Sequence, residues 1–217
     1  LVNYFTFLAQ EVREYLAEMG YTKLEDIVGH TELLQLKPTA NGSKASTLDF
    51  SRLLHKEAGP CSLYHTTDQI HDLSNILDQQ IIRSSQKAIA SQEEVNLDYA
   101  IKNTDRATGV MLSGLVAQKY GAQGLPDSTI NVKFKGSAGQ SFGAFLAGGI
   151  SFKLEGETND YFGKGLSGGR IAILPPVRSN FNAEDNIIAG NTGLYGATSG
   201  ELYINGKVGE RFAVRNS

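Results

Sequence analysis

Glycine recurs at a regular spacing through the second half of the chain, and this pattern restricts the fold more than any other feature. The first stretch, GSAGQSFG, spans Gly136 to Gly143. The matching small residues form the sets Gly136, Gly139 and Gly143; Gly156, Asn159 and Gly163; Gly190, Gly193 and Ala197; and Gly206, Gly209 and Ala213. Glycine tolerates positive φ and close backbone contact at no steric cost. A repeat of about 20 residues is typical of solenoids, so we predict a structural role for these glycines.

Apolar and polar residues alternate over three stretches beside the repeats: Ile130 to Phe134, Ile150 to Leu154, and Ile171 to Ile173. This period is that of a strand with one buried face. Hairpins would need short turns of the Asn-Gly type, and in this half of the chain only Asn205-Gly206 provides one. We therefore predict a mainly β fold with an α-helical N-terminal part, in which the β portion is a right-handed parallel β-helix, a single-stranded solenoid.

Two further features of the repeats follow from their spacing. Phe142, Phe162 and Tyr195 occupy equivalent positions, which predicts an aromatic stack along the repeats. The interval between the second and third repeats is longer by residues 175–185, which begin with Pro175-Pro176. These residues are predicted to form a loop at one edge.

The first half of the chain has helical periodicity. Apolar residues at i, i+3 and i+4 predict a helix with one buried stripe from Leu1 to Gly20, and a short helix after Thr22. A further short helix is predicted over Leu48 to His55. A longer helix is predicted to start at Thr67 and to bury Ile70, Leu73, Leu77 and Ile81.

The middle of the chain is less uniform. Val95 to Ile101 alternates as a strand does, although Ser91 and Glu94 also fit a helix capping box. Residues 106–120 fit either a strand or a helix that ends before Gly121. We predict the strand at Val95 and leave residues 106–120 open.

Composition excludes several classes of protein. The net charge of -3, with 20% charged residues, gives no basic excess, so we expect no nucleic-acid partner. Cys61 is the one cysteine, which rules out an internal disulfide and a cysteine set for zinc or an iron–sulphur cluster, and favours the cytoplasm. No apolar run reaches the roughly 18 residues of a membrane span. The chain begins at Leu1 inside a helical pattern, so we expect a piece of a longer protein.

Motifs that could carry chemistry are weak. Gly163 to Gly168 satisfies the dinucleotide fingerprint G-x-G-x-x-G, but a strand pattern follows it where a helix would be needed. Cys61 beside Pro60 is more often an ordinary residue than a nucleophile, and Asp105-Arg106 fits a turn better than an acid–base pair. The histidines share no metal-ligand spacing; they are His30, His55, His65 and His71. We predict no catalytic, cofactor-binding or metal-binding residue.

The glycine-rich runs resemble a known family. GSAGQSFGAFLAGGISFKLEG, NDYFGKGLSGGRIAI and NIIAGNTGLYGATSGELYINGKVGERFAVRNS are similar to the C-terminal β-helix of the glutamate synthase large subunit. LVNYFTFLAQEVREYLAEMGY and LEDIVGHTELL resemble the end of the flavin-binding synthase domain, and the similarity resumes at LDYAIKNTDRATG. The resemblance implies a synthase-domain tail at residues 1–60, a helical connector at 61–94, and a β-helix domain, truncated at its C-terminal end, at 95–217.

The resemblance implies a parent enzyme that takes the amide nitrogen of glutamine and passes ammonia to 2-oxoglutarate. That enzyme reduces the adduct with electrons from FMN and an iron–sulphur cluster. The family's nucleophile is an N-terminal cysteine, whereas position 1 is Leu1, and its cluster needs several cysteines, whereas this chain has Cys61. The chain alone is therefore expected to hold no cofactor and to be inactive. Its expected partners are the other domains of the large subunit and a small electron-donating subunit or ferredoxin.

Two other classes stay open. A separate β-helix protein could dock partner subunits without catalysis; a start codon just before Leu1 would favour it, and a reading frame continuing upstream would favour the glutamate synthase part. A small-molecule binding module that uses the glycine turns is the third class, and calorimetry against FMN and nicotinamide nucleotides tests it. The same repeat type resembles a subunit of formylmethanofuran dehydrogenase, but the N-terminal helices favour glutamate synthase.

Overall fold

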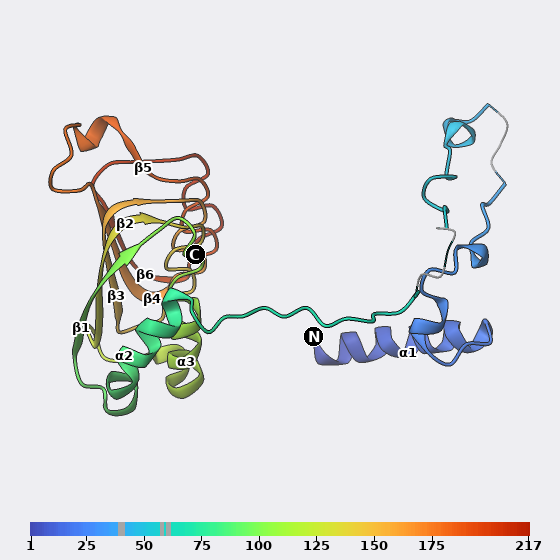
Figure 1. The fold of residues 1–217 in the computed structure, drawn as a ribbon, viewed down its shortest axis with the longest axis horizontal. Coiled ribbons are helices and arrows are strands. Elements are labelled where there is room, and N and C mark those ends of the chain that lie inside the picture. Colours follow the sequence, from blue (N-terminus) through green and yellow to red (C-terminus); the bar gives the residue numbers. More distant parts are fainter. Residues whose placement is uncertain (39–41, 57–58, 60–61) are drawn as a thin grey trace. The chain divides into compact units, whose positions relative to one another are not determined.

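The computed structural model describes residues 1–38, 42–56, 59 and 62–217 (Figure 1). The chain divides into two compact units, Leu1–His71 and Asp72–Ser217. The division expected from the family resemblance, at residues 1–60, 61–94 and 95–217, stays a prediction. Pro60 and Cys61, the weak nucleophile motif of the sequence, lie outside the described residues.

The first unit begins with α1 (Val2–Glu18), followed by the 3-10 helices η1 (Leu24–Ile27), η2 (Thr31–Leu33) and η3 (Lys44–Thr47). The predicted helix from Leu1 to Gly20 and the short helix after Thr22 are confirmed. The buried stripe is not, because Leu16 is the one buried residue of α1. The helix predicted over Leu48 to His55 is wrong: the Asp49 carboxylate accepts a hydrogen bond from Ser51 N (2.9 Å), a local turn that competes with helix formation.

The second unit combines a parallel sheet with helices. Its helices are α2 (Leu77–Ser91), α3 (Val110–Tyr120), η4 (Gly121–Gln123) and η5 (Ala183–Asp185). Its strands are β1 (Val95–Ile101), β2 (Ile130–Ala138), β3 (Ile150–Thr158), β4 (Ser167–Leu174), β5 (Ile187–Ala189), β6 (Ser199–Ile204) and β7 (Lys207–Val208). The strands predicted from alternation are confirmed, and residues 110–120 are helical. The long helix begins at Leu77 rather than Thr67, and Ile70 and Leu73 are exposed.

Within the described residues, seven strands form one sheet in the order β1-β2-β3-β4-β6, with β5 beside β3 and β7 beside β5. Every pairing is parallel, and β2 and β3 match over nine residues, from Ile130 against Ile150 to Ala138 against Thr158. Asn205-Gly206 therefore connects β6 and β7 without making a hairpin, since each pairs with a different strand.

The predicted fold class, mainly β with a right-handed parallel β-helix, is wrong. The structure has one parallel sheet, with α2 before β1 and α3 between β1 and β2 in the chain, which is an α/β arrangement (Figure 1). The physical reason is that each repeat supplies only one long regular strand. The rest of the repeat contains left-handed turns, for example at residues 141–145. Hydrogen bonds connect each of these turns to the next, but they do not form a second sheet.

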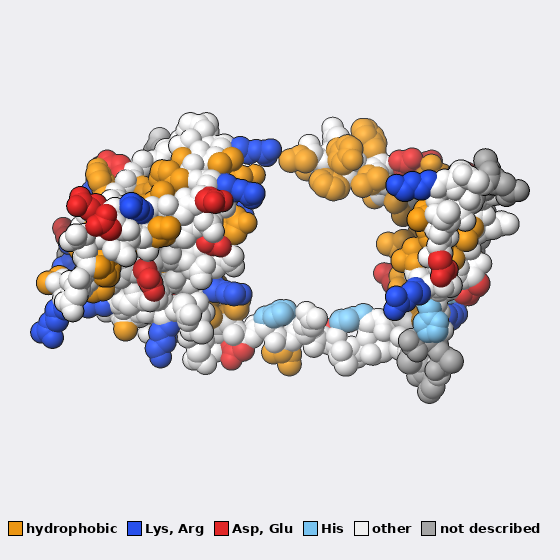
Figure 2. Space-filling view, turned by 90° about the horizontal axis from the view of Figure 1, so that it is seen from above, with side chains coloured by type: hydrophobic (Ala, Val, Ile, Leu, Met, Phe, Trp, Pro, Cys, Tyr) orange, Lys and Arg blue, Asp and Glu red, His pale blue; other side chains and the backbone are white. Residues whose placement is uncertain are grey.

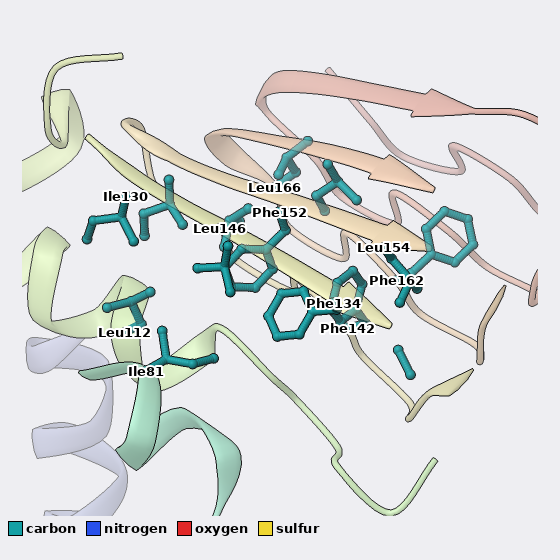
Figure 3. Packing of buried hydrophobic residues seen from close by; sticks show 14 of the residues in the cluster. Ile81, Leu112, Ile130, Phe134, Phe142, Leu146, Phe152, Leu154, Phe162 and Leu166 are labelled. Atoms are coloured by element: carbon teal, nitrogen blue, oxygen red, sulfur yellow. The ribbon is translucent and has the colours of Figure 1, made fainter. Parts of the chain in front are cut away.

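The core lies on one face of the sheet (Figure 3). Strand register places Val132, Phe152 and Ile171 side by side, and all three are buried. The ring centroid of Phe134 lies 4.9 Å from that of Phe152 and 5.3 Å from that of Phe142. The helices continue this core at one end through side chains such as Ile81 and Leu112.

Candidate functional site

Four short segments of the second unit share an unusual backbone, and we call them together the turn ladder: residues 141–145, 161–165, 192–196 and 211–215. In each, the first, third and fifth residues have φ between 55° and 66°. These residues are Ser141, Gly143, Phe145, Tyr161, Gly163, Gly165, Thr192, Leu194, Gly196, Arg211, Ala213 and Arg215. Left-handed conformations are costly for residues other than glycine, so the surrounding contacts must hold them in place.

Backbone hydrogen bonds connect the segments of the turn ladder. The central N–H of each donates to a carbonyl of the preceding segment: Gly163 N to Phe142 O (2.9 Å), Leu194 N to Phe162 O (2.9 Å), and Ala213 N to Gly193 O (2.8 Å). The first residue of the segment donates forward, as Ser141 N does to Asp160 O (2.8 Å). Hydrogen bonds between backbone groups thus connect each segment of the turn ladder to the next.

The glycines of the predicted repeat lie close to backbone or side-chain atoms of neighbouring segments. Gly136 and Gly156 are adjacent in the register of β2 and β3, and a Cβ on Gly156 would overlap Gly136 O. Gly143 has φ of 65°, and a Cβ there would lie 2.5 Å from Ile171 Cδ1. The other repeat glycines also face close neighbours; they are Gly139, Gly163, Gly190, Gly193, Gly206 and Gly209.

The third repeat has a different register from the predicted one. Gly190 N donates to Thr158 O (3.0 Å) just as Asn159 N donates to Ala138 O (3.1 Å), so Gly190 aligns with Asn159 and not with Gly156. Gly193 accordingly takes the position of Phe162. Tyr195 therefore does not share the position of Phe142 and Phe162. The predicted stack of these three rings is not observed: the ring of Phe142 packs against Phe134 and Phe152, and that of Phe162 against Phe212.

A second set of glycines lies at the opposite ends of the strands, and the sequence reading missed it. Gly149, Gly168 and Gly200 have φ of 83°, 103° and 113°, at or just before the starts of β3, β4 and β6. A Cβ on Gly149 would lie 2.6 Å from Leu125 O. The available signal was the Gly-Gly pair that precedes an apolar alternation, as in Gly148-Gly149 before Ile150.

Asp78 closes the first end of the turn ladder. Ala107 and Gly109 also have positive φ, and Ala107 N donates to Gln140 O (2.8 Å), so residues 107–109 form an incomplete first segment. Gly109 N has no preceding segment to donate to and donates instead to Asp78 Oδ1 (2.5 Å), while Met111 N donates to Asp78 Oδ2 (2.8 Å). The carboxylate thus takes the place of a carbonyl and caps the N-terminus of α3.

Asp78 is 3% exposed. Burial raises its pKa, while the N–H groups of Gly109, Met111 and Leu112 act in the opposite direction. Sequence reading did not identify Asp78; its signal is an acidic residue between Leu77 and Ile81 on the buried side of a helix.

A groove of about 700 Å³ lies between α3 and one side of the turn ladder. Its lining consists of Val110, Ser113, Gly114, Ala117, Gly121, Ala122, Phe145, Ala147, Ser167, Thr198 and Ser199. None of these described residues has an ionisable side chain. Such a surface offers close packing, and it lacks the acids and bases that would activate its serine and threonine hydroxyls for a reaction.

The weak motifs remain apart from this groove or have structural partners. Gly163 N and Gly165 N, in the dinucleotide-like stretch, donate within the turn ladder, and β4 follows them. The Asp105 carboxylate accepts a hydrogen bond from Lys102 N (2.8 Å), which closes a turn. His30 Nδ1 lies 2.6 Å from Glu32 Oε1, a contact that helps to lower the pKa of Glu32 to about 2, after the larger effect of its backbone hydrogen bond.

Among the described residues, histidine, cysteine and acidic side chains do not form a cluster of three that could bind a metal ion. None of the helices that the structure describes is both long and apolar enough to cross a bilayer.

Comparison with known proteins gives whole-chain matches. The chain is 45% identical over 222 residues to "Glutamate synthase [NADPH] large chain" of Bacillus subtilis, 46% over 220 residues to "Glutamate synthase [NADH]" of Saccharomyces cerevisiae, and 45% over 220 residues to "Ferredoxin-dependent glutamate synthase 2" of Synechocystis. Each match covers 100% of this chain but 14%, 10% and 14% of the respective relative. The family model "GXGXG motif" matches residues 78–217, beginning at Asp78. The chain therefore belongs to the GXGXG family and is similar over its whole length to the C-terminal region of glutamate synthase large chains.

Proposed function

We propose that this chain is a structural, non-catalytic part of a cytoplasmic glutamate synthase large chain. The parent enzyme makes glutamate from glutamine and 2-oxoglutarate by ammonia transfer and reduction, and the chain alone is inactive. The observation that carries the proposal is the similarity of the whole chain, at 45% identity, to a region that is 14% of the Bacillus subtilis large chain.

The chemistry of the surface supports a structural role. The described lining of the groove beside α3 has no ionisable group, and several backbone amides of the turn ladder are used in hydrogen bonds between its segments. The identities are also nearly equal for relatives named after NADPH, NADH and ferredoxin. A region that differed with the electron donor would not show this, so electron entry belongs to other parts of the parent.

The first unit supports the presence of further domains. Large apolar side chains gather along α1 and are exposed (Figure 2), including Tyr4, Phe5, Phe7, Leu8 and Tyr15. Exposed apolar patches of this kind mark interaction surfaces. We infer that the other domains of the large chain cover α1, that those domains hold FMN and the iron–sulphur cluster, and that an electron-donating subunit or ferredoxin acts on them.

The test compares the purified 217-residue chain with the complete large chain. Each is mixed with glutamine, 2-oxoglutarate and a reduced donor, and oxidation of the donor is followed together with glutamate formation. We expect turnover from the complete chain and none above the background from the 217 residues. Glutamine- and 2-oxoglutarate-dependent turnover by the 217-residue chain would overturn the proposal.

A further inference from the structure

We propose that the groove between α3 and the turn ladder binds an apolar segment from another domain of the same large chain, with Phe145 as the anchor of the contact. This inference rests on the proposed function, because it takes the occupant from the remainder of that chain. It adds a specific surface and a specific residue to the structural role.

The floor of the groove is made of small side chains on one side of α3. Ser113, Gly114 and Ala117 follow helical spacing, so they form a continuous strip along the groove. Side chains this small allow the backbone of a neighbouring segment to approach closely, which increases van der Waals contact. The side chains of Met111 and Leu115 on the same helix are also exposed, so the apolar surface extends beyond the groove.

Phe145 is the residue whose presence the second unit alone does not explain. It has φ of 56°, and the equivalent positions in the next two segments, Gly165 and Gly196, are glycines with φ of 62° and 66°. Phe145 is 50% exposed, so burial offsets only part of the cost of a left-handed conformation. Gly165 leaves room for this ring, since a Cβ there would lie 2.5 Å from it.

The backbone of Phe145 is held by the hydrogen bond from its N–H to Lys164 O (2.7 Å), so its ring is presented at the groove before any partner arrives. Aromatic residues presented in this way are typical anchors of protein interfaces, because little conformational freedom is lost on binding. The uncharged lining selects an uncharged apolar segment. Since the chain covers 14% of the Bacillus subtilis relative, most of a parent chain of that length is available to supply it at the high effective concentration of a linked partner.

The experiment places the photo-crosslinking residue p-benzoylphenylalanine at position 145 of the complete large chain, and mass spectrometry maps the crosslinked peptides. We expect one main crosslink, within the same chain, to a segment outside residues 1–217. Position 161 serves as the matched control, because Tyr161 has the same backbone conformation (φ of 61°) and is 37% exposed but does not line the groove. We expect roughly tenfold less of the same crosslinked product there.

A blocking variant completes the design. Ala117→Arg puts a long charged side chain on the exposed floor of the groove and should lower the crosslink at position 145 at least about fivefold, while the melting temperature of the 217-residue chain stays within about 2 °C. The proposal is overturned if position 145 crosslinks to a second copy of the chain, crosslinks only within residues 1–217, or gives no crosslink. Activity of the isolated chain would refute the proposed function instead, so the two failures are distinguishable.

Discussion

Removal of the Asp78 carboxylate tests whether this group closes the turn ladder. Asp78→Ala leaves the N–H groups of Gly109, Met111 and Leu112 without their acceptor in a site where Asp78 is 3% exposed. A buried N–H left unpaired costs about 1 to 3 kcal/mol, which gives several kcal/mol for the three groups. The variant also removes the cost of burying a charged carboxylate, a cost that the raised pKa of Asp78 indicates. We therefore expect a net loss of about 3 kcal/mol in the free energy of unfolding.

For a unit of this size, a loss of about 3 kcal/mol corresponds to a fall in melting temperature of roughly 6 to 12 °C. Circular dichroism melts measure this fall, and hydrogen exchange of the Gly109 and Met111 amides reports the local opening. Asp98→Ala is the control, because Asp98 is an exposed aspartate on β1. The reasoning fails if the two variants have the same melting temperature, or if hydrogen exchange of the Gly109 amide is unchanged in Asp78→Ala.

The pH dependence gives a second measurement on the same group. Burial raises the pKa of Asp78, so between its ordinary and raised values the folded chain binds a proton more tightly than the unfolded chain does. The stability that this proton contributes is fully present below the ordinary pKa and is lost as the pH rises through the raised pKa. The difference in stability between the wild type and Asp78→Asn should therefore shrink on going from about pH 3.5 to pH 7 in urea titrations. A difference that grows over this range would contradict the assigned direction.

Two glycine substitutions test the turn ladder itself. Gly143→Val puts a β-branched residue at φ of 65° with its Cβ 2.5 Å from Ile171 Cδ1. Strain of about 1 to 3 kcal/mol should lower the melting temperature, which calorimetry measures. An unchanged melting temperature would refute a left-handed turn at this position. Gly193→Ala has no φ penalty but places a Cβ against the ring of Phe162, so overpacking should cost about 1 to 3 kcal/mol in urea unfolding. That cost should fall in a Phe162→Leu background, and an equal cost in both backgrounds would show that the two side chains do not meet.

Strands were predictable where burial alternates along a regular strand. On β3, Ile150, Phe152 and Leu154 are buried, while Ser151 and Lys153 between them are less so. A sheet with one apolar face imposes this period of two on the sequence. The alternation therefore located β1, β2, β3 and β4.

The glycine period of about 20 residues misled the prediction of fold class. Such a period is typical of a solenoid, in which the strands of one coil stack on those of the next. In the structure, the stretch that begins at Gly136 continues into left-handed residues at every second position, at Ser141, Gly143 and Phe145. Periodic glycines indicate where the backbone turns, but they do not show whether a further strand follows each turn.

The predicted start of α2, at Thr67, was wrong for a different reason. Ile70 and Leu73 continue the helical spacing of Leu77 and Ile81, yet both are exposed and precede the helix. The Asp72 carboxylate accepts a hydrogen bond from Ser74 N (2.9 Å), which favours a local turn over a helix. The spacing of apolar residues alone does not reveal that such a local turn competes with the helix.

The register of the third repeat shows why glycine spacing cannot by itself align this family of turns. The glycine spacing pairs Gly190 with Gly156. The chain between β4 and β5 contains the extra loop of residues 175–186, however, and the backbone hydrogen bonds align Gly190 with Asn159, three residues after Gly156. In that alignment Gly193 falls between Phe162 and Phe212, whose ring centroids are 6.3 Å apart. A ring at position 193 would overlap that of Phe162, because even a Cβ there already does. Position 193 thus requires glycine because of the size of the neighbouring rings and not because of its own φ. This requirement can be seen only when the segments are stacked on one another.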